Sequence, residues 1–299
     1  MIKPQRVALY LLLILMSAFF IAPFWIAGIV SIRDTNDLYS YPIHEPTSGE
    51  EIELWENFIS YLHGGWVAHG SDKSKSVFTY NYYIGLEYLR NSLMYGIFGS
   101  MGAILIASLG AYSITKIPYR GSYVLFLLIF SMIFFPSQIY LIPLWDILRI
   151  TMLYNTLPGM MLIYVGLGAP FATFILRNHF VTISKEILES ARMDGASELR
   201  IWATIVMPLA KPALAVCFIF VFNFIMQDFL FASVMVSTSS IRPTMPFIYS
   251  LVHVGSVGKI VNWPVGTVGA LFASLPTIIV FIALQKYFVR GILMGAVKR

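Results

Sequence analysis

Residues 8–30 read ALYLLLILMSAFFIAPFWIAGIV, an apolar run without a single charged side chain. An α-helix rises 1.5 Å per residue and the bilayer core is about 30 Å thick, so roughly 20 apolar residues can cross a membrane. The run is longer than the hydrophobic part of a typical signal peptide, and no clear cleavage site follows it. We therefore expect a retained membrane-spanning helix here.

Five further runs have the same character, at residues 93–113, 123–144, 157–176, 213–236 and 268–288. The chain is 58% hydrophobic and 12% charged, whereas soluble domains carry about 25% charged residues. Backbone groups in lipid must be hydrogen-bonded within their own segment, and the runs lack the alternating pattern of a barrel. The sequence predicts an all-α, polytopic protein of the cell membrane with six transmembrane helices.

The basic residues indicate an orientation. If the N-terminus lies inside, the inner segments carry 13 of the 20 Lys and Arg residues, although the outer segments are longer. Lys and Arg are enriched on the cytoplasmic side of membrane proteins. We expect an N-in, C-in topology. The excess of basic residues is then expected to interact with anionic lipid at the inner face and not with nucleic acid.

The runs divide the chain into residues 1–32 with the first helix, an extracytoplasmic loop at 33–90, and a core at 91–299 with five helices. The aromatic stretch FTYNYYIGLEYLRNS at 78–92 suits an interfacial belt, with a partner-binding surface as the alternative. His63 and His69 form too weak a ligand set to predict a metal site.

Prolines interrupt several runs, and such breaks suggest a translocation path or ordinary kinks. They are Pro136, Pro143, Pro170 and Pro276.

The usual signatures of enzymes are missing from the sequence. It contains no phosphate-binding P-loop, no GxSxG, no HExxH and no CxxC. We expect no catalysis, no cofactor and no metal. The runs contain one acid, Asp228, with Asn223 and Gln227 nearby. Polar groups at membrane depth usually face a bundle interior or cavity, so these three residues line a solute path or hold the bundle together.

The most polar stretch lies between two apolar runs, EILESARMDGASELRIWATIVMPLAKP at 186–212. Ser184 is a plausible N-cap for a first helix over 185–194, and Gly195 stands where a left-handed residue would end it. Ser197 can cap a second helix, and Pro208 would close it. A stripe of Ile187, Leu188 and Ala191 is expected on the first helix, and one of Leu199, Trp202, Ile205 and Val206 on the second. The near balance of charge favours docking in a groove of another protein over lying on a membrane.

This stretch resembles the EAA loop of the permease subunits of ATP-binding-cassette importers. The matching residues are Glu189-Ser190-Ala191, Gly195 and Ile205-Val206-Met207-Pro208, while Ser184 stands where these permeases often have Pro. Asn91-Ser92, Ala111-Tyr112, Leu153-Tyr154-Asn155-Thr156, QDFLFA at 227–232 and the tail GILMGAVKR are similar to the carbohydrate branch, close to the maltose-type second permease. The resemblance covers about residue 91 to the end.

The resemblance implies a type I importer transmembrane domain that imports a carbohydrate without being an enzyme itself. Its implied partners are a second related permease, a dimer of cytoplasmic ATPase subunits and an extracytoplasmic solute-binding protein. The coupling loop at about 184–208 would transmit ATPase motion through Glu189, Ser190, Ala191, Asp194, Gly195, Ala196, Ser197, Ile205 and Pro208. The tail would contact the ATPases through Gly295, Ala296, Val297 and Lys298. An importer for amino acids, phosphate or a metal shares the EAA loop, and an ion-coupled secondary carrier is a more distant alternative.

Overall fold

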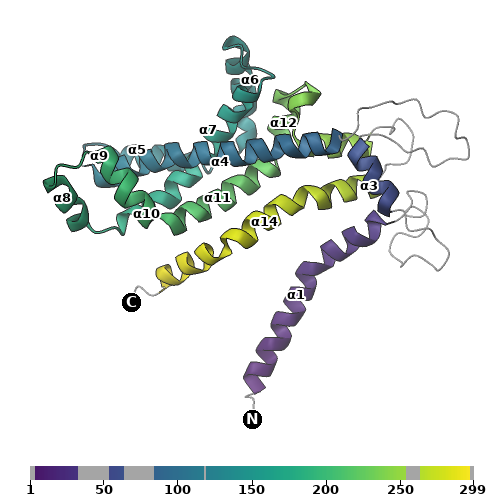
Figure 1. Cartoon of the computed structure of the whole chain (residues 1–299), viewed down its shortest axis with the longest axis horizontal. Coiled ribbons are helices and arrows are strands. Elements are labelled where there is room, and N and C mark those ends of the chain that lie inside the picture. The colour runs from purple at the N-terminus through teal and green to yellow at the C-terminus, as the bar shows by residue number, and fades with distance from the viewer. Residues whose placement is uncertain (1–3, 33–53, 64–83, 118, 254–262, 297–299) are drawn as a thin grey trace, which may run out of the picture. The chain divides into compact units, whose positions relative to one another are not determined.

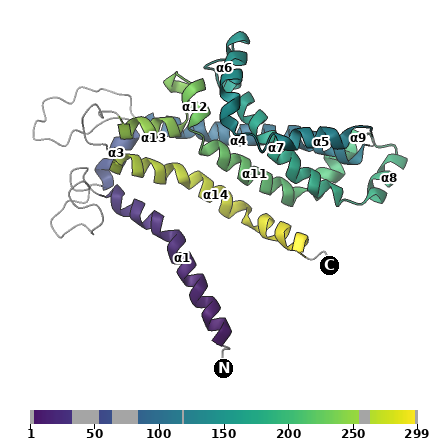
Figure 2. The ribbon, with the colours of Figure 1, turned by 180° about the vertical axis from the view of Figure 1, so that it is seen from behind.

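The computed structural model describes residues 4–32, 54–63, 84–117, 119–253 and 263–296, and within them the regular structure is helical with no strand (Figure 1 and, seen from behind, Figure 2). The elements in chain order are α1 (Pro4–Ser31), α3 (Leu54–His63), α4 (Ile84–Lys116), α5 (Ser122–Ser131), η1 (Ser137–Tyr140), α6 (Leu141–Ile150), α7 (Leu157–Val181), α8 (Lys185–Met193), α9 (Glu198–Ile201), η2 (Trp202–Val206), α10 (Met207–Leu209), α11 (Lys211–Met226), α12 (Leu230–Met235), η3 (Ser239–Ile241), α13 (Thr244–His253) and α14 (Trp263–Ala296). The all-α class predicted from the sequence is confirmed. Most of the predicted loop at 33–90 lies outside the described residues.

The chain forms two compact units. The first comprises residues 1–87 and 247–274, and the second comprises residues 88–246 and 275–299. Because α4, α13 and α14 each contribute to both units, the predicted boundary between residues 90 and 91 lies inside the continuous helix α4.

The first unit packs around the fully buried Tyr61 of α3. Its ring lies 5.8 Å from that of Phe247 on α13 and 6.0 Å from that of Phe272 on α14. Aromatic pairs at this separation are favourable beyond the area that they bury. The side-chain amide of Asn57 donates a 2.9 Å hydrogen bond to the carbonyl of Ser31, which fixes the end of α1 against α3.

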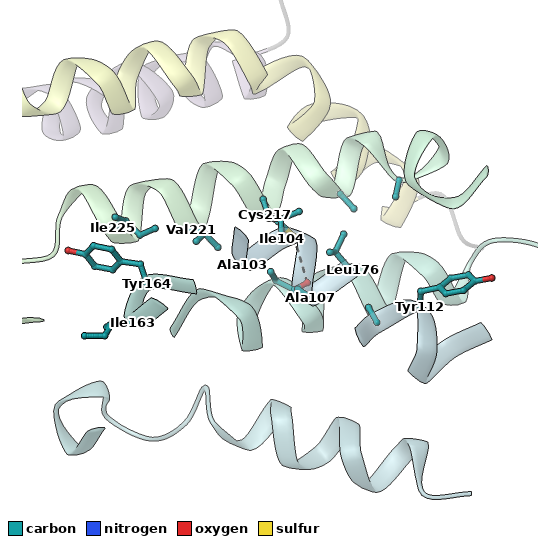
Figure 3. Packing of buried hydrophobic residues seen from close by; sticks show 14 of the residues in the cluster. Ala103, Ile104, Ala107, Tyr112, Ile163, Tyr164, Leu176, Cys217, Val221 and Ile225 are labelled. Atoms are coloured by element: carbon teal, nitrogen blue, oxygen red, sulfur yellow. Dashed lines mark hydrogen bonds between the residues drawn. The ribbon is translucent and has the colours of Figure 1, made fainter. Parts of the chain in front are cut away.

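The second unit is built on α4, α7 and α11, whose buried side chains meet in one cluster (Figure 3). Small residues permit close helix packing: a Cβ added to Gly96 would come within 2.7 Å of Phe222, and one added to Gly168 within 2.7 Å of Val221. Lipid offers no hydrophobic drive for helix association, so such close approach supplies the dispersion energy. Cys217 is fully buried in this cluster.

Four of the described helices are long and apolar enough to cross a membrane, namely those over residues 9–31, 85–116, 157–181 and 263–287. A fifth span is formed if the segment 198–209 and α11, which meet at a bend of 80°, count as one. The prediction of six spans and the prediction of orientation remain expectations.

The predicted third span at 123–144 is not one helix. Helix α5 ends at Ser131, the chain turns through Met132 to Pro136, and η1 and α6 follow. Proline has no amide hydrogen and disfavours the helical conformation of the preceding residue, which favours a break at Phe135 and Pro136. The predicted fifth span is also interrupted, since α11 ends at Met226 and α12 begins at Leu230.

Candidate functional site

The first helix of the polar stretch, α8, ends in a Schellman motif. Gly195 has φ of +80°, and its amide donates to the carbonyl of Arg192 at 3.0 Å, while the amide of Ala196 donates to that of Ala191 at 3.0 Å. Glycine adopts this left-handed conformation without a steric penalty. Asp194 precedes it as the C-cap residue. The predicted stop at Gly195 is confirmed.

The same helix begins at Lys185, directly after the predicted N-cap Ser184. The Ser184 hydroxyl does not bond to a backbone amide of the helix; it donates to the carboxylate of Glu186. That hydrogen bond lowers the pKa of Glu186. Thus Ser184 is the residue that directly precedes the helix, as predicted. Its side chain, however, bonds to the first-turn acid Glu186 and not to a backbone amide.

The second helix runs from α9 through the π-helical turn η2 to α10. The Ser197 hydroxyl accepts the amide of Arg200 at 3.4 Å, which confirms the predicted cap. The π-helical turn changes the buried face, because Ile201 and Val206, five residues apart, are both fully buried. Leu199 was expected in the apolar stripe and is instead 64% exposed, since that stripe assumed an uninterrupted α-helical period.

The outer surface of this helix pair combines apolar and polar side chains. Ile187 is 47% exposed and Met193 is 88% exposed, so the predicted stripe on α8 buries only Leu188 fully. Glu189 and Ser190 are exposed as well. On the second helix, Pro208 is exposed, Ile205 is half-buried, and so is Ala196 in the turn. An exposed face of this composition is typical of a docking surface.

A hydrogen-bonded network connects the helix pair to the end of α4. Arg192 donates through Nε to Glu198 Oε1 at 2.7 Å, and Tyr112 donates to Glu198 Oε2 at 2.5 Å. Arg192 also reaches the carbonyl of Lys116 at 3.3 Å, while the Lys116 ammonium donates to the carbonyl of Ile183 at 2.6 Å. Hydrogen bonds from Arg192 and then Tyr112 lower the pKa of Glu198. These contacts therefore link α8 and the second helix directly to the end of α4.

The three predicted path residues separate into two arrangements. Gln227 donates to the side chain of Asn223 at 2.8 Å, and Gln227 is exposed. Asp228 faces elsewhere: its carboxylate accepts the hydroxyl of Tyr164 at 2.9 Å and the amides of Phe231 and Ala232 at 3.2 and 2.9 Å. Asp228 therefore caps α12 and joins it to α7.

A cavity of about 520 Å³ lies between the broken third run, α7 and α11. Its wall contains the rings of Phe171, Phe220 and Phe224, and its polar groups are few. Those polar groups are Ser137, Gln138 and Tyr140 at the helix break. Pro136 at the helix break and Pro170, which lies inside the uninterrupted helix α7 and so does not break it, both line this cavity, whereas Asn223, Gln227 and Asp228 do not. The aromatic wall was missed because it is assembled from two separate runs.

Other predicted features are only partly described. Gly295 and Ala296 lie in the last turn of α14, and Val297 and Lys298 lie outside the described residues. His69 is also outside them. Among the residues that the structure describes, no group of three or more His, Cys, Asp or Glu side chains could hold a metal ion.

Comparison with known proteins identifies the family. Residues 88–294 match the model of the binding-protein-dependent transport system inner membrane component. The chain belongs to this family. It is accordingly a multi-pass membrane protein and a transport component, as the sequence predicted.

Two relatives show how far the similarity extends. The chain is 34% identical to the osmoprotective compounds uptake permease protein GgtD of Synechocystis sp. over 71% of its own length and 70% of that protein. It is 37% identical to the alpha-glucoside transport system permease protein AglG of Rhizobium meliloti over 72% of its length, but the match spans only 57% of AglG.

A solved structure shares the fold. A bacterial ABC transporter involved in the import of the acidic polysaccharide alginate superposes with a TM-score of 0.72, covering 95% of this chain and 96% of that chain. The two sequences are 22% identical, so this likeness concerns the fold alone.

Two of the permease motifs quoted from the sequence, those that contain Asn91 and Asn155, form hydrogen bonds within the second unit. Asn91 donates through its amide to the carbonyls of Ser240 and Arg242 at 2.9 and 3.1 Å. Asn155 accepts the amides of Ser237 and Thr238 at 2.9 and 3.0 Å. Both motifs therefore fix the segment that follows α12, a role that sequence spacing alone did not indicate.

Proposed function

We propose that this chain is a permease subunit of an ATP-driven, binding-protein-dependent importer of a carbohydrate, and that it forms half of the translocation path. The observation that carries the proposal is the helix pair over residues 185–209 within a chain of this permease family. Its Schellman turn, Ser197 cap and connection to α4 form a rigid, mixed-polarity element outside the long helices.

The helix pair is proposed to dock on a dimer of cytoplasmic ATPase subunits, which hydrolyse ATP in place of this chain. Exposed Ile187, Met193 and Leu199 supply apolar contacts, and Glu189 and Ser190 supply polar ones. Arg192 is not available to Glu189, because it pairs with Glu198. Within the described part of the chain Glu189 forms no ion pair, so its carboxylate can accept a partner's donor. The tail at Gly295 to Lys298 is a second proposed contact.

The cavity beside the helix break is proposed to form this subunit's part of the solute path. Sugar rings present C–H groups on their faces and hydroxyls on their edges. Phe171, Phe220 and Phe224 can stack against the faces, while Gln138 and Tyr140 can bond to the hydroxyls. Asn223 and Gln227 would extend this path, whereas Asp228 holds α12. A second, related permease would supply the opposite wall.

The similarity to the alpha-glucoside permease AglG supports the carbohydrate class. The test is deletion of the gene followed by uptake of a panel of labelled sugars, oligosaccharides, amino acids, phosphate and metal ions. We expect loss of uptake confined to one carbohydrate class and restored by the intact gene. Loss confined to an amino acid, phosphate or a metal ion would overturn the carbohydrate assignment.

The cavity is tested in the restored strain. Gln138→Ala and Phe224→Ala should raise the half-saturating solute concentration, because both remove contacts to the solute. Leu128→Ala is the control, since Leu128 is 62% exposed on α5 and does not line the cavity. Unchanged uptake in both cavity variants would remove the cavity from the proposed path.

A further inference from the structure

A second cavity, of about 590 Å³, lies between the end of α4, the start of α5 and one face of α8. Four basic side chains line it: Lys116, Arg120, Lys185 and Arg192. The acid on its wall is Glu189. Arg192 is neutralised by Glu198, but within the described residues no carboxylate lies within ion-pair distance of Lys116, Arg120 or Lys185. The cavity therefore carries an excess of positive charge.

The cavity shares Glu189 with the surface that is proposed to meet the ATPases, but the cavity lies mostly on another face of α8. Lys185, Leu188, Glu189 and Arg192 occur at intervals of three and four and form one face of α8, the face toward α4. Ile187 and Ser190 project from the opposite face. A ligand in the cavity would thus lie between α8 and the α4–α5 turn, leaving the outer face of α8 free.

The surroundings favour a lipid over a soluble anion. The cavity is located where the long apolar helix α4 ends and the apolar helix α5 begins. Tyr123 and Val124, which follow the cavity residue Ser122, are 62% and 59% exposed. Acyl chains can lie along this apolar surface while a phosphate group meets the bases. Basic pockets between transmembrane helices are known sites for anionic lipid headgroups.

We propose that this cavity binds the phosphate headgroup of an anionic phospholipid, with Lys116, Arg120 and Lys185 as its ligands and the acyl chains along α5. The bound headgroup would bridge the α4–α5 turn and α8, and so stabilise one position of α8. This lipid site depends on the cavity and on its position at the membrane, and it does not depend on which solute the protein carries.

The test is retention of phosphatidylglycerol by the protein, purified in mild detergent with the subunits that accompany it, measured by native mass spectrometry after exchange from mixed phosphatidylglycerol and phosphatidylcholine. The double variant Arg120→Gln with Lys185→Gln should reduce retention about tenfold, because two of the headgroup's cationic partners are lost. The control Arg200→Gln with Lys211→Gln removes the same charge from exposed positions outside the cavity. It should retain the lipid as the unaltered protein does.

Two further measurements keep the outcomes distinct. Arg120→Lys with Lys185→Arg should restore retention, which separates loss of charge from loss of folding. Millimolar inorganic phosphate should not displace the lipid, since a free anion lacks acyl chains. Equal loss in the cavity and control variants, unchanged retention in the cavity variant, or displacement by phosphate would each overturn the proposal.

Discussion

Tyr164 and Asp228, 64 positions apart, are joined by a 2.9 Å hydrogen bond from the phenol to the carboxylate. The same carboxylate accepts two amides at the start of α12. A carboxylate that accepts hydrogen bonds from three such donors primarily has a structural role, and we call it an anchor. We therefore reinterpret Asp228, which the sequence placed on a polar strip with Asn223 and Gln227, as the residue that positions α12.

Replacement of this anchor should affect stability. Asp228→Leu removes the cap of α12 and leaves the buried Tyr164 hydroxyl without its acceptor, so the free energy of unfolding should fall by about 2 to 4 kcal/mol. Asp228→Asn keeps an acceptor oxygen and should lose less than half as much. Thermal unfolding in detergent measures both. Gln227→Ala is the neighbouring control and should leave the melting temperature unchanged; equal losses in all three would contradict the anchor role.

The conformation of Gly195 gives a prediction with a close control. Gly195→Ala places a Cβ at φ of +80° and should destabilise the end of α8 by about 1 kcal/mol. Gly121→Ala meets the same strain at φ of +93°, and neither Cβ would have a neighbour within 4 Å. We expect similar stability losses, but reduced ATP-driven uptake in reconstituted vesicles for Gly195→Ala alone. Full uptake by the Gly195 variant would separate this turn from coupling.

The proposed ATPase contact of Glu189 can be tested against another acid on the same helix. Glu189→Gln should lower solute uptake per ATP hydrolysed, because its carboxylate has no ion-pair partner within the described chain. Glu186→Gln alters an acid that is already bonded to Ser184, one turn earlier, and should have a smaller effect. Uptake and hydrolysis are measured together in vesicles. An identical ratio in both variants would argue against a specific role for Glu189.

The lowered pKa of Glu198 makes the connection between α8 and α4 sensitive to acid. A carboxyl with a lower pKa in the folded state contributes stability above its unfolded pKa of about 4.3 and loses it as pH falls through the folded value. Its side chain is 43% exposed, so solvent screening keeps the effect below about 1 kcal/mol. Melting temperatures between pH 6 and pH 3 should show a shallower fall in Glu198→Gln than in the unaltered protein. Parallel curves would show that Glu198 does not contribute.

Close helix packing gives a matched pair on α7. A Cβ on Gly168 would lie 2.7 Å from Val221 and 3.1 Å from the Cβ of Ala103, while one on Gly166 would meet nothing within 4 Å. Gly168→Ala should therefore destabilise the bundle by about 1 to 3 kcal/mol, and Gly166→Ala should be neutral or slightly stabilising. Thermal unfolding of the two variants compares them directly. Equal melting temperatures would show that α7 and α11 can move apart without cost.

The sequence by itself determined the features that depend on neighbouring residues. Apolar length predicted the long helices, Ser197 and Gly195 predicted a cap and a stop, and the EAA-like spacing predicted the family. These features are local because a cap or a left-handed turn is satisfied by backbone groups within a few positions. Pro136 likewise predicted a break in the third run. It did not predict that the run would divide into α5, η1 and α6.

Only the tertiary structure decided which side chains meet. Arg192 could have paired with Glu189 three residues earlier, yet it pairs with Glu198 across the turn and shares that acid with Tyr112 on α4. The π-helical turn rotated Leu199 to the surface and brought Ile201 and Val206 to one face. Such outcomes depend on how α4, α7, α8 and α11 pack, and packing joins residues that no spacing in the sequence relates.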